Sequence, residues 1–258
     1  MPPIPLDTQA VMLPYLLAAA RAVGIIALLP GISAPHVPPQ VRITISLGLA
    51  VVVAGVAAPP VTIPQDPIAY TLMLVGELGL GLIIGWAVSV FFESVRWAGE
   101  ILDIQIGLRA GQLLDPSGFG VSTLLGQLYH LVATTFFFVV DGHHWVLAAI
   151  ARSYSRLPVG SVSFTPRALE LLVSAAQSAL DIGIRTAAAG VAALLLADIA
   201  MSIIGRQVPQ MNVFLVGLPA KLVAGLVVLA TSAPLMGGAL WYIVEGVKHV
   251  VLALLAGR

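Results

Sequence analysis

Six long apolar runs follow one another along the chain, separated by short polar stretches. They cover residues 10–29, 43–58, 68–92, 121–140, 171–204 and 213–244. About 20 apolar residues in a helix cross the roughly 30 Å of hydrocarbon in a bilayer. The pattern therefore predicts an all-α, polytopic membrane protein built from helical hairpins. The second run is short for a span, and the last two are long enough to bend or divide.

Prolines mark several of the boundaries between these runs. Pro30, Pro38 and Pro59 each fall in a stretch between two runs, as expected for a residue that removes a helical donor and restricts its predecessor. Pro219 and Pro234 lie inside the last run and predict kinks or a break there.

The composition agrees with a membrane protein and excludes several other classes. Charged residues make up 9% of the chain, against about a quarter in soluble domains, and the mean hydropathy is +1.02. The 12 basic and 12 acidic residues balance, so no basic surface indicates a nucleic-acid partner. Because the chain has no cysteine, disulfides and thiolate metal sites are excluded. Lys and Arg divide almost evenly between the two sides, so the positive-inside rule assigns no orientation.

Ionisable residues inside apolar runs are costly and are candidates for function. They are Arg21, Glu77, Asp181, Arg185, Asp198 and Lys221. Asp181 and Arg185 are four residues apart, so an intrahelical ion pair is predicted between them. The alternative is a proton or ion relay of the kind that secondary transporters use, which would need several acids near one site.

A second open question concerns the glycines of the third run. Gly81 and Gly85 have the spacing that allows two helix backbones to approach closely. Such a close approach can occur within the chain or at a subunit interface, and the sequence favours neither.

The tetrapeptide from Asp141 to His144 contains two histidines, His143 and His144. Adjacent side chains on a helix point about 100° apart, and no further ligands follow at short spacing. We therefore predict a polar turn after a span and no metal. The chain also lacks the motifs of serine hydrolases, zinc peptidases and phosphate-binding loops, so it is not expected to be an enzyme or to bind a cofactor.

The most polar stretch lies between the third and fourth runs. Glu93, Arg96, Glu100 and Asp103 form one stripe on a helix, along which Arg96 can pair with Glu93 and Glu100. A second polar row contains Gln105, Arg109 and Gln112. We expect one charged helix over residues 93–112.

Turn-forming residues follow this helix and should end it. They are Asp115, Pro116, Ser117, Gly118, Phe119 and Gly120. One interpretation is an exposed connector after a solvated helix. The other is an amphipathic helix that leads into a loop lining or blocking a water-filled path. The residues by themselves favour neither of these two interpretations over the other.

Several motifs, taken in order, resemble the FliR family, the R component of the flagellar type III export gate, which the injectisome export apparatus shares. The matching stretches include residues 34–42, 100–107, 115–116, 141–144 and 153–160. The most telling is residues 206–214, Arg-Gln-Val-Pro-Gln-Met-Asn-Val-Phe, continuing to Gly217-Leu218-Pro219. The motifs extend over nearly the whole chain, and their order and spacing match those of the family.

The resemblance implies a non-enzymatic subunit of the protein-export channel. In that family the R subunit joins P- and Q-like subunits in a helical ring, together with other export apparatus membrane proteins, and unfolded proteins pass through. It implies a multi-pass protein of the bacterial inner membrane, in contact with lipid, within the flagellar basal body. Residues 1 to about 205 would be P-like, and about 206–258 a Q-like hairpin. A proton-coupled carrier of small solutes is the alternative.

The resemblance also assigns roles to residues. The loop from Asp115 to Leu124 corresponds to the family's pore-plugging loop, and its six turn-forming residues, 115–120, would form the plug. The preceding polar helix, with Glu93, Arg96, Glu100, Asp103, Gln105 and Arg109, would line the pore. The motif before the last hairpin would make helix turns and subunit contacts through Arg206, Pro209, Gln210 and Asn212.

Overall fold

The computed structural model describes residues 8–34, 37–54, 64, 66–108, 123–161, 166–207 and 213–256. These residues form α1 (Thr8–Leu28), α2 (Pro39–Ala54), α3 (Pro67–Ile106), α5 (Leu124–Val139), α6 (Gly142–Arg156), α7 (Pro166–Gln207) and α8 (Val213–Ala256). None of the described residues is in a strand. The predicted all-α class is confirmed.

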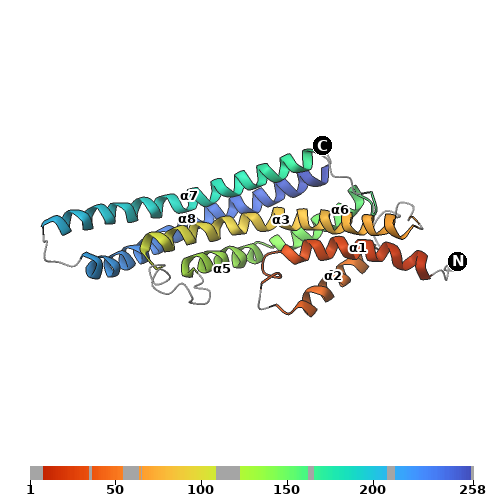
Figure 1. Cartoon of the computed structure of the whole chain (residues 1–258), viewed down its shortest axis with the longest axis horizontal. Coiled ribbons are helices and arrows are strands. Elements are labelled where there is room, and N and C mark those ends of the chain that lie inside the picture. Colours follow the sequence, from red (N-terminus) through yellow and green to blue (C-terminus); the bar gives the residue numbers. More distant parts are fainter. Residues whose placement is uncertain are drawn as a thin grey trace. The chain divides into compact units, whose positions relative to one another are not determined.

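Three of the helices are much longer than a bilayer is thick. α3, α7 and α8 contain 40, 42 and 44 residues, and each is drawn as an uninterrupted ribbon (Figure 1). At 1.5 Å per residue each extends over about 60 Å, twice the usual hydrocarbon thickness. Kinks or a break are predicted at Pro219 and Pro234; the break is wrong, since α8 continues through both prolines, and the kinks stay a prediction. Proline is tolerated inside apolar membrane helices because neighbouring groups can satisfy the freed backbone carbonyl.

Helix α6 lies where the sequence pattern predicts only a polar turn. The turn is confined to Val140 and Asp141, and a helix follows at once. Its buried side chains include Val146, Ala149 and Ile150, which recur at the spacing of one helical face. That periodicity was the signal that could have identified α6.

The helices differ in their capacity to cross a membrane. By length and composition α3 and α7 can each span it, and α5 with α6 counts as a third span if the bent pair is taken as one. In α1, α2 and α8 the apolar stretches whose side chains are described, Met12–Leu28, Pro39–Val52 and Pro219–Thr231, are shorter than 18 residues. Two or three spans are therefore found within the described residues, whereas the sequence has six apolar runs near spanning length.

The chain divides into two compact units that alternate along the sequence. The first contains Met1–Val90, Val140–Ala176 and Val247–Arg258, and the second Phe91–Val139 and Gln177–Gly246. The long helices α3, α7 and α8 each contribute to both. The expected division near residue 205 into a P-like and a Q-like part stays a prediction.

In the first unit, α1 lies directly against the N-terminal part of α3, visible as neighbouring red and orange ribbons in Figure 1. A Cβ atom added at Gly24 would lie 2.6 Å from the carbonyl oxygen of Leu78, and one at Gly85 2.7 Å from that of Ile25. At Gly81 the added atom would overlap the carbonyl of Arg21. These glycines therefore serve packing within the chain, which decides the question that the sequence left open.

In the second unit, the C-terminal part of α3 packs against α5 and α7. The rings of Phe92 and Phe137 meet edge to face, with 5.2 Å between centroids. A Cβ atom at Gly99 would lie 2.5 Å from the carbonyl oxygen of Leu125, and one at Gly183 2.7 Å from that of Ser94. Close backbone approach thus fixes the C-terminal part of α3 between two other helices.

Candidate functional site

The polar stripe on α3 forms the side-chain pairs that its spacing predicted. Arg96 Nη1 lies 3.0 Å from Glu93 Oε2, and its Nε lies 3.1 Å from Glu100 Oε1. The three side chains are 23–43% exposed, so water or a polar surface can reach them. One guanidinium held between two carboxylates leaves this face of the helix with a net negative charge.

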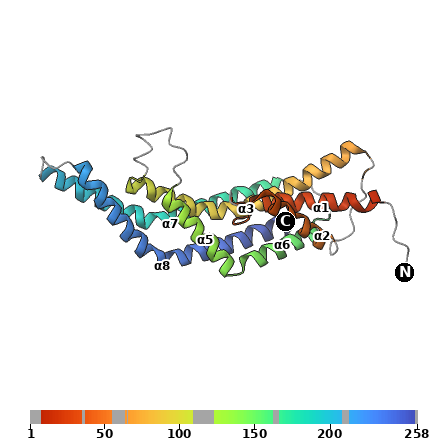
Figure 2. The same ribbon diagram turned by 90° about the horizontal axis from the view of Figure 1, so that it is seen from below.

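Asp103 lies on the same stripe, but its side chain is fully buried. Its carboxylate accepts hydrogen bonds from the backbone N–H of Leu125, at 3.1 and 3.2 Å, and of Gly126, at 3.3 Å. These are N–H groups of the first turn of α5, whose start lies beside the end of α3 (Figure 2). A carboxylate at this place satisfies free donors and complements the helix dipole. Asp103, predicted to line a pore, thus has an internal role that its spacing did not reveal.

Helix α3 ends earlier than expected. Gly107 adopts a left-handed φ of 88°, its N–H donates to the carbonyl of Ile104, and the N–H of Leu108 donates to the carbonyl of Asp103. This pattern is the Schellman motif that commonly ends helices at glycine. The prediction of one continuous charged helix over residues 93–112 is therefore wrong at Gly107 and Leu108, where α3 has ended. Arg109, Gln112 and the turn-forming residues 115–120 lie outside the described residues.

The described residues on either side of segment 109–122 form hydrogen bonds at one place on α3. On one side, Leu108 donates to the backbone carbonyl of Asp103. On the other side, Leu125 donates to the carboxylate of Asp103, and the Thr123 hydroxyl lies 3.4 Å from Glu100 Oε1. The chain thus leaves α3 and returns to it within about one helical turn.

A second polar cluster joins the end of α3 to α7 and α8. Lys221 Nζ lies 2.5 Å from Asp198 Oδ1, and both side chains are about one-third exposed or less. Gln105 Nε2 donates to Asp198 Oδ2 at 3.2 Å, and the Gln105 carbonyl lies 3.5 Å from Lys221 Nζ. Gln105 lies two residues after Asp103 in the last turn of α3, so this cluster holds the same end of the helix.

In the first unit, Arg21 of α1 and Glu77 of α3 form a fully buried ion pair. Arg21 Nε donates to Glu77 Oε2 at 2.6 Å, and Nη2 donates to Oε1 at 3.0 Å. Two further hydrogen bonds hold the pair: Arg21 Nη1 donates to the Leu157 carbonyl, and the Gly160 N–H donates to Glu77 Oε1. The guanidinium also lies 4.4 Å from the centre of the Tyr154 ring.

The predicted pair of Asp181 and Arg185 is confirmed, with 2.7 Å between Arg185 Nε and Asp181 Oδ2 on an exposed face of α7. Each ionisable residue that the sequence placed in an apolar run therefore has a partner of opposite charge. The three pairs are Arg21–Glu77, Asp181–Arg185 and Asp198–Lys221. Asp181 and Asp198 each face a base, an arrangement that suits structural pairing.

The remaining predicted site residues are described only in part. Arg206 lies exposed in the last turn of α7. Pro209, Gln210 and Asn212 fall outside the described residues, so their predicted contacts stay predictions.

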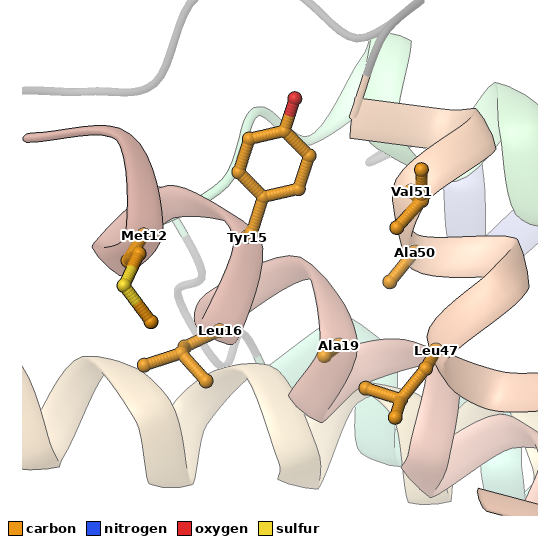
Figure 3. Close-up of a pocket in the computed structure, with 7 residues that line it drawn as sticks. All are labelled: Met12, Tyr15, Leu16, Ala19, Leu47, Ala50 and Val51. Carbon is orange, nitrogen blue, oxygen red and sulfur yellow. The ribbon is translucent and has the colours of Figure 1, made fainter. Parts of the chain in front are cut away.

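An apolar pocket of about 170 Å³ lies between α1 and α2 in the first unit (Figure 3). It is lined by Met12, Tyr15, Leu16, Ala19, Leu47, Ala50 and Val51, and the Tyr15 hydroxyl points away from the other labelled side chains. This lining offers contact area for an apolar group and no polar chemistry.

Known proteins of similar sequence cover most of the chain. Residues 12–247 match the family model described as bacterial export proteins, family 1. The flagellar biosynthetic protein FliR of Escherichia coli (strain K12) is 27% identical over 225 residues, 86% of this chain and 85% of that protein. The FliR of Caulobacter vibrioides is 29% identical over 84% of this chain and 86% of its own length. The secretion system apparatus protein SsaT of Salmonella typhimurium is 27% identical over 63% of each chain.

Proposed function

Since this chain belongs to the family of bacterial export proteins, family 1, we propose that it is a structural subunit of the type III export gate. In this role it forms, with P- and Q-like subunits, the channel through which unfolded flagellar proteins are exported. Family membership itself makes the protein a membrane component of a flagellar or type III export apparatus that associates with other proteins of that apparatus. We place it in the bacterial inner membrane, within the flagellar basal body.

The proposal is carried by one observation: Leu108 and Leu125, on either side of segment 109–122, both donate hydrogen bonds to Asp103. Asp103 binds the chain on both sides of this segment, through its carbonyl and its carboxylate. A gate needs a segment that can move while its base keeps its position. The hydrogen bonds of Leu108 and Leu125 to Asp103 provide such a base. The small residues around Phe119 suit a segment that plugs a pore. We therefore propose that Asp115, Pro116, Ser117, Gly118, Phe119 and Gly120 close the pore.

Residues near this base would face the channel. Glu93, Arg96 and Glu100 are partly exposed on α3 and carry charges that a water-filled path can solvate. Gln105 contacts both members of the Asp198–Lys221 pair, and we propose that it lines the channel together with Arg109. Asp103 contributes differently, because its carboxylate is already satisfied inside the chain.

The exposed apolar residues support assembly with partner subunits and lipid. In the most apolar stretch of α7 only 17% of residues are buried within this chain, and Leu195, Leu196 and Ile199 are among those exposed. Water is an unfavourable environment for such a surface. We propose that P- and Q-like subunits and lipid cover it, and that the motif at Arg206, Pro209, Gln210 and Asn212 contributes to these contacts.

Co-purification tests the assembly. The chain produced with its P- and Q-like partners should elute from size-exclusion chromatography as one discrete complex, and the chain produced alone should aggregate. A stable monomer that transports a small solute in vesicles would contradict the export-gate proposal and support the carrier.

Deletion of residues 118–122 tests the plug. In the assembled complex this deletion should increase ion leak across vesicles without preventing assembly, because the base at Asp103 is unchanged. Arg152→Gln, an exposed change in α6, serves as the control and should leave the leak unaltered. Unchanged leak in an intact complex with the deletion would show that the loop does not close the pore.

A further inference from the structure

Three side chains that commonly bind metal lie together where α5 gives way to α6. Asp141 ends the turn, and His143 and His144 are in the first turn of α6. One ligand atom from each residue lies within 4.8 Å of those of the other two. The sequence prediction excluded a metal here because adjacent histidines on a helix diverge. That reason does not hold, since the two imidazole rings lie 4.1 Å apart between centroids.

The spacing of these groups is close to that of a bound ion. Zinc binds imidazole nitrogen and carboxylate oxygen at about 2.0–2.2 Å, which places tetrahedral ligand atoms about 3.3 Å apart. His144 Nδ1 and Asp141 Oδ1 are already separated by 3.2 Å. The side chains of Asp141 and His144 are 72% and 68% exposed, so rotation about their own bonds can bring the three ligands together.

The backbone directs the Asp141 side chain to this place. Asp141 has a φ of 58°, the one positive value outside glycine among the described residues. It occupies the N-cap of α6, yet its carboxylate makes no capping hydrogen bond and lies beside His144 instead. An aspartate at this position usually accepts a bond from the helix backbone. Asp141 and His144 are thus paired, and the His143 ring lies beside this pair, 4.1 Å from the His144 ring between centroids.

We propose that Asp141, His143 and His144 form a binding site for a divalent transition-metal ion, with zinc as the ion to test. Two imidazoles and one carboxylate are ligands that zinc accepts, and three protein ligands leave one position for water. Because the three residues lie within four positions at the start of α6, the ion would hold the turn and the first helical turn in one arrangement. The inference is independent of the channel function.

Zinc binding to the full-length protein tests the site directly. The protein is purified with its export apparatus partners through a tag without histidine, treated with a chelator and titrated with zinc chloride. Bound metal is measured by mass spectrometry after desalting. We expect roughly one zinc ion per chain. His143→Gln and His144→Gln should each weaken binding by a factor on the order of ten or more, because one of three ligands is lost. His249→Gln, at an exposed histidine of α8, is the matched control and should bind as the original chain does.

Two further measurements separate ligand loss from misfolding. Asp141→Gly suits a left-handed φ better than aspartate does, so it should fold normally and still lose zinc affinity. Cobalt at the intact site should give the intense visible absorption of a tetrahedral complex, and the three variants should not. Absence of bound zinc in the original chain would overturn the proposal. An equal loss of binding in the His249→Gln control would also overturn it, because the bound zinc would then be an adventitious ion only.

Discussion

The guanidinium of Arg21 and the carboxylate of Glu77 lie 2.6 Å apart between Nε and Oε2, and neither side chain is exposed. They join α1 to α3 at the place where Gly81 lets the two backbones approach. Two charges removed from water in this way are tolerated only because each has its partner and further hydrogen bonds. The Gly160 N–H and the Leu157 carbonyl complete these bonds, so the turn after α6 is bound to the same pair.

Breaking this pair on one side should strongly destabilise the protein. Glu77→Gln or Arg21→Met leaves a buried group without its partner, and we expect the free energy of unfolding to fall by about 3–5 kcal/mol. Denaturant unfolding of the purified complex, followed by tryptophan fluorescence, measures this change.

The double variant Arg21→Met with Glu77→Leu should recover most of the loss, because it removes both charges together. Asp181→Asn breaks an exposed pair and is the control, for which we expect no measurable change. If Glu77→Gln were as stable as the original chain, the pair would not hold α1 to α3.

Gly81→Ala tests the close approach of α1 and α3. The added methyl group overlaps the carbonyl of Arg21, so the helices must separate. We expect a loss of about 1–3 kcal/mol in unfolding free energy. Gly48→Ala in α2 is the matched control, since no heavy atom lies within 4 Å of the added carbon. That variant should be unchanged or more stable by up to about 1 kcal/mol, because alanine is the better helix former. Equal effects of the two changes would contradict intramolecular packing at Gly81.

Asp103→Ala should loosen the start of α5. It removes the acceptor for the N–H groups of Leu125 and Gly126, and we expect a loss of about 1–3 kcal/mol. Hydrogen exchange of the first turn of α5 should accelerate in this variant. Asp103→Asn keeps one acceptor oxygen and should be affected less. Glu93→Ala, at a partly exposed position of the same stripe, should leave exchange in α5 unchanged. Unaltered exchange in Asp103→Ala would show that α5 is held by other contacts.

Asp198→Asn separates a structural role from a proton relay. Asparagine can still accept hydrogen bonds from Gln105 and Lys221, so a structural pair predicts that assembly and protein export persist. Secretion of flagellar proteins by cells that carry the variant measures this outcome. Normal assembly with complete loss of export would favour the relay.

Local pattern alone determined much of the architecture. The apolar runs predicted six of the helices. Backbone polar groups in lipid must be hydrogen-bonded within the chain, so a long apolar segment forms a helix whatever surrounds it. The stripe of Glu93, Arg96 and Glu100 and the pair of Asp181 and Arg185 were predicted correctly for a related reason. A helix fixes which side chains are neighbours at a spacing of three or four residues. The order of motifs also led to the correct family.

Only the tertiary structure decided the contacts between residues distant in sequence. Arg21 and Glu77 are 56 residues apart, and Asp103 and Leu125 are 22 apart, so no periodicity relates them. The end of α3 at Ile106 depended on the left-handed turn at Gly107, where the sequence offered polar residues that could equally continue a helix. The meeting of His143 and His144 depended on side-chain rotation, which helical geometry does not fix. Spacing thus determined each helix and its own face, whereas the packing of separate helices determined which charges are paired, which are buried and where a metal could bind.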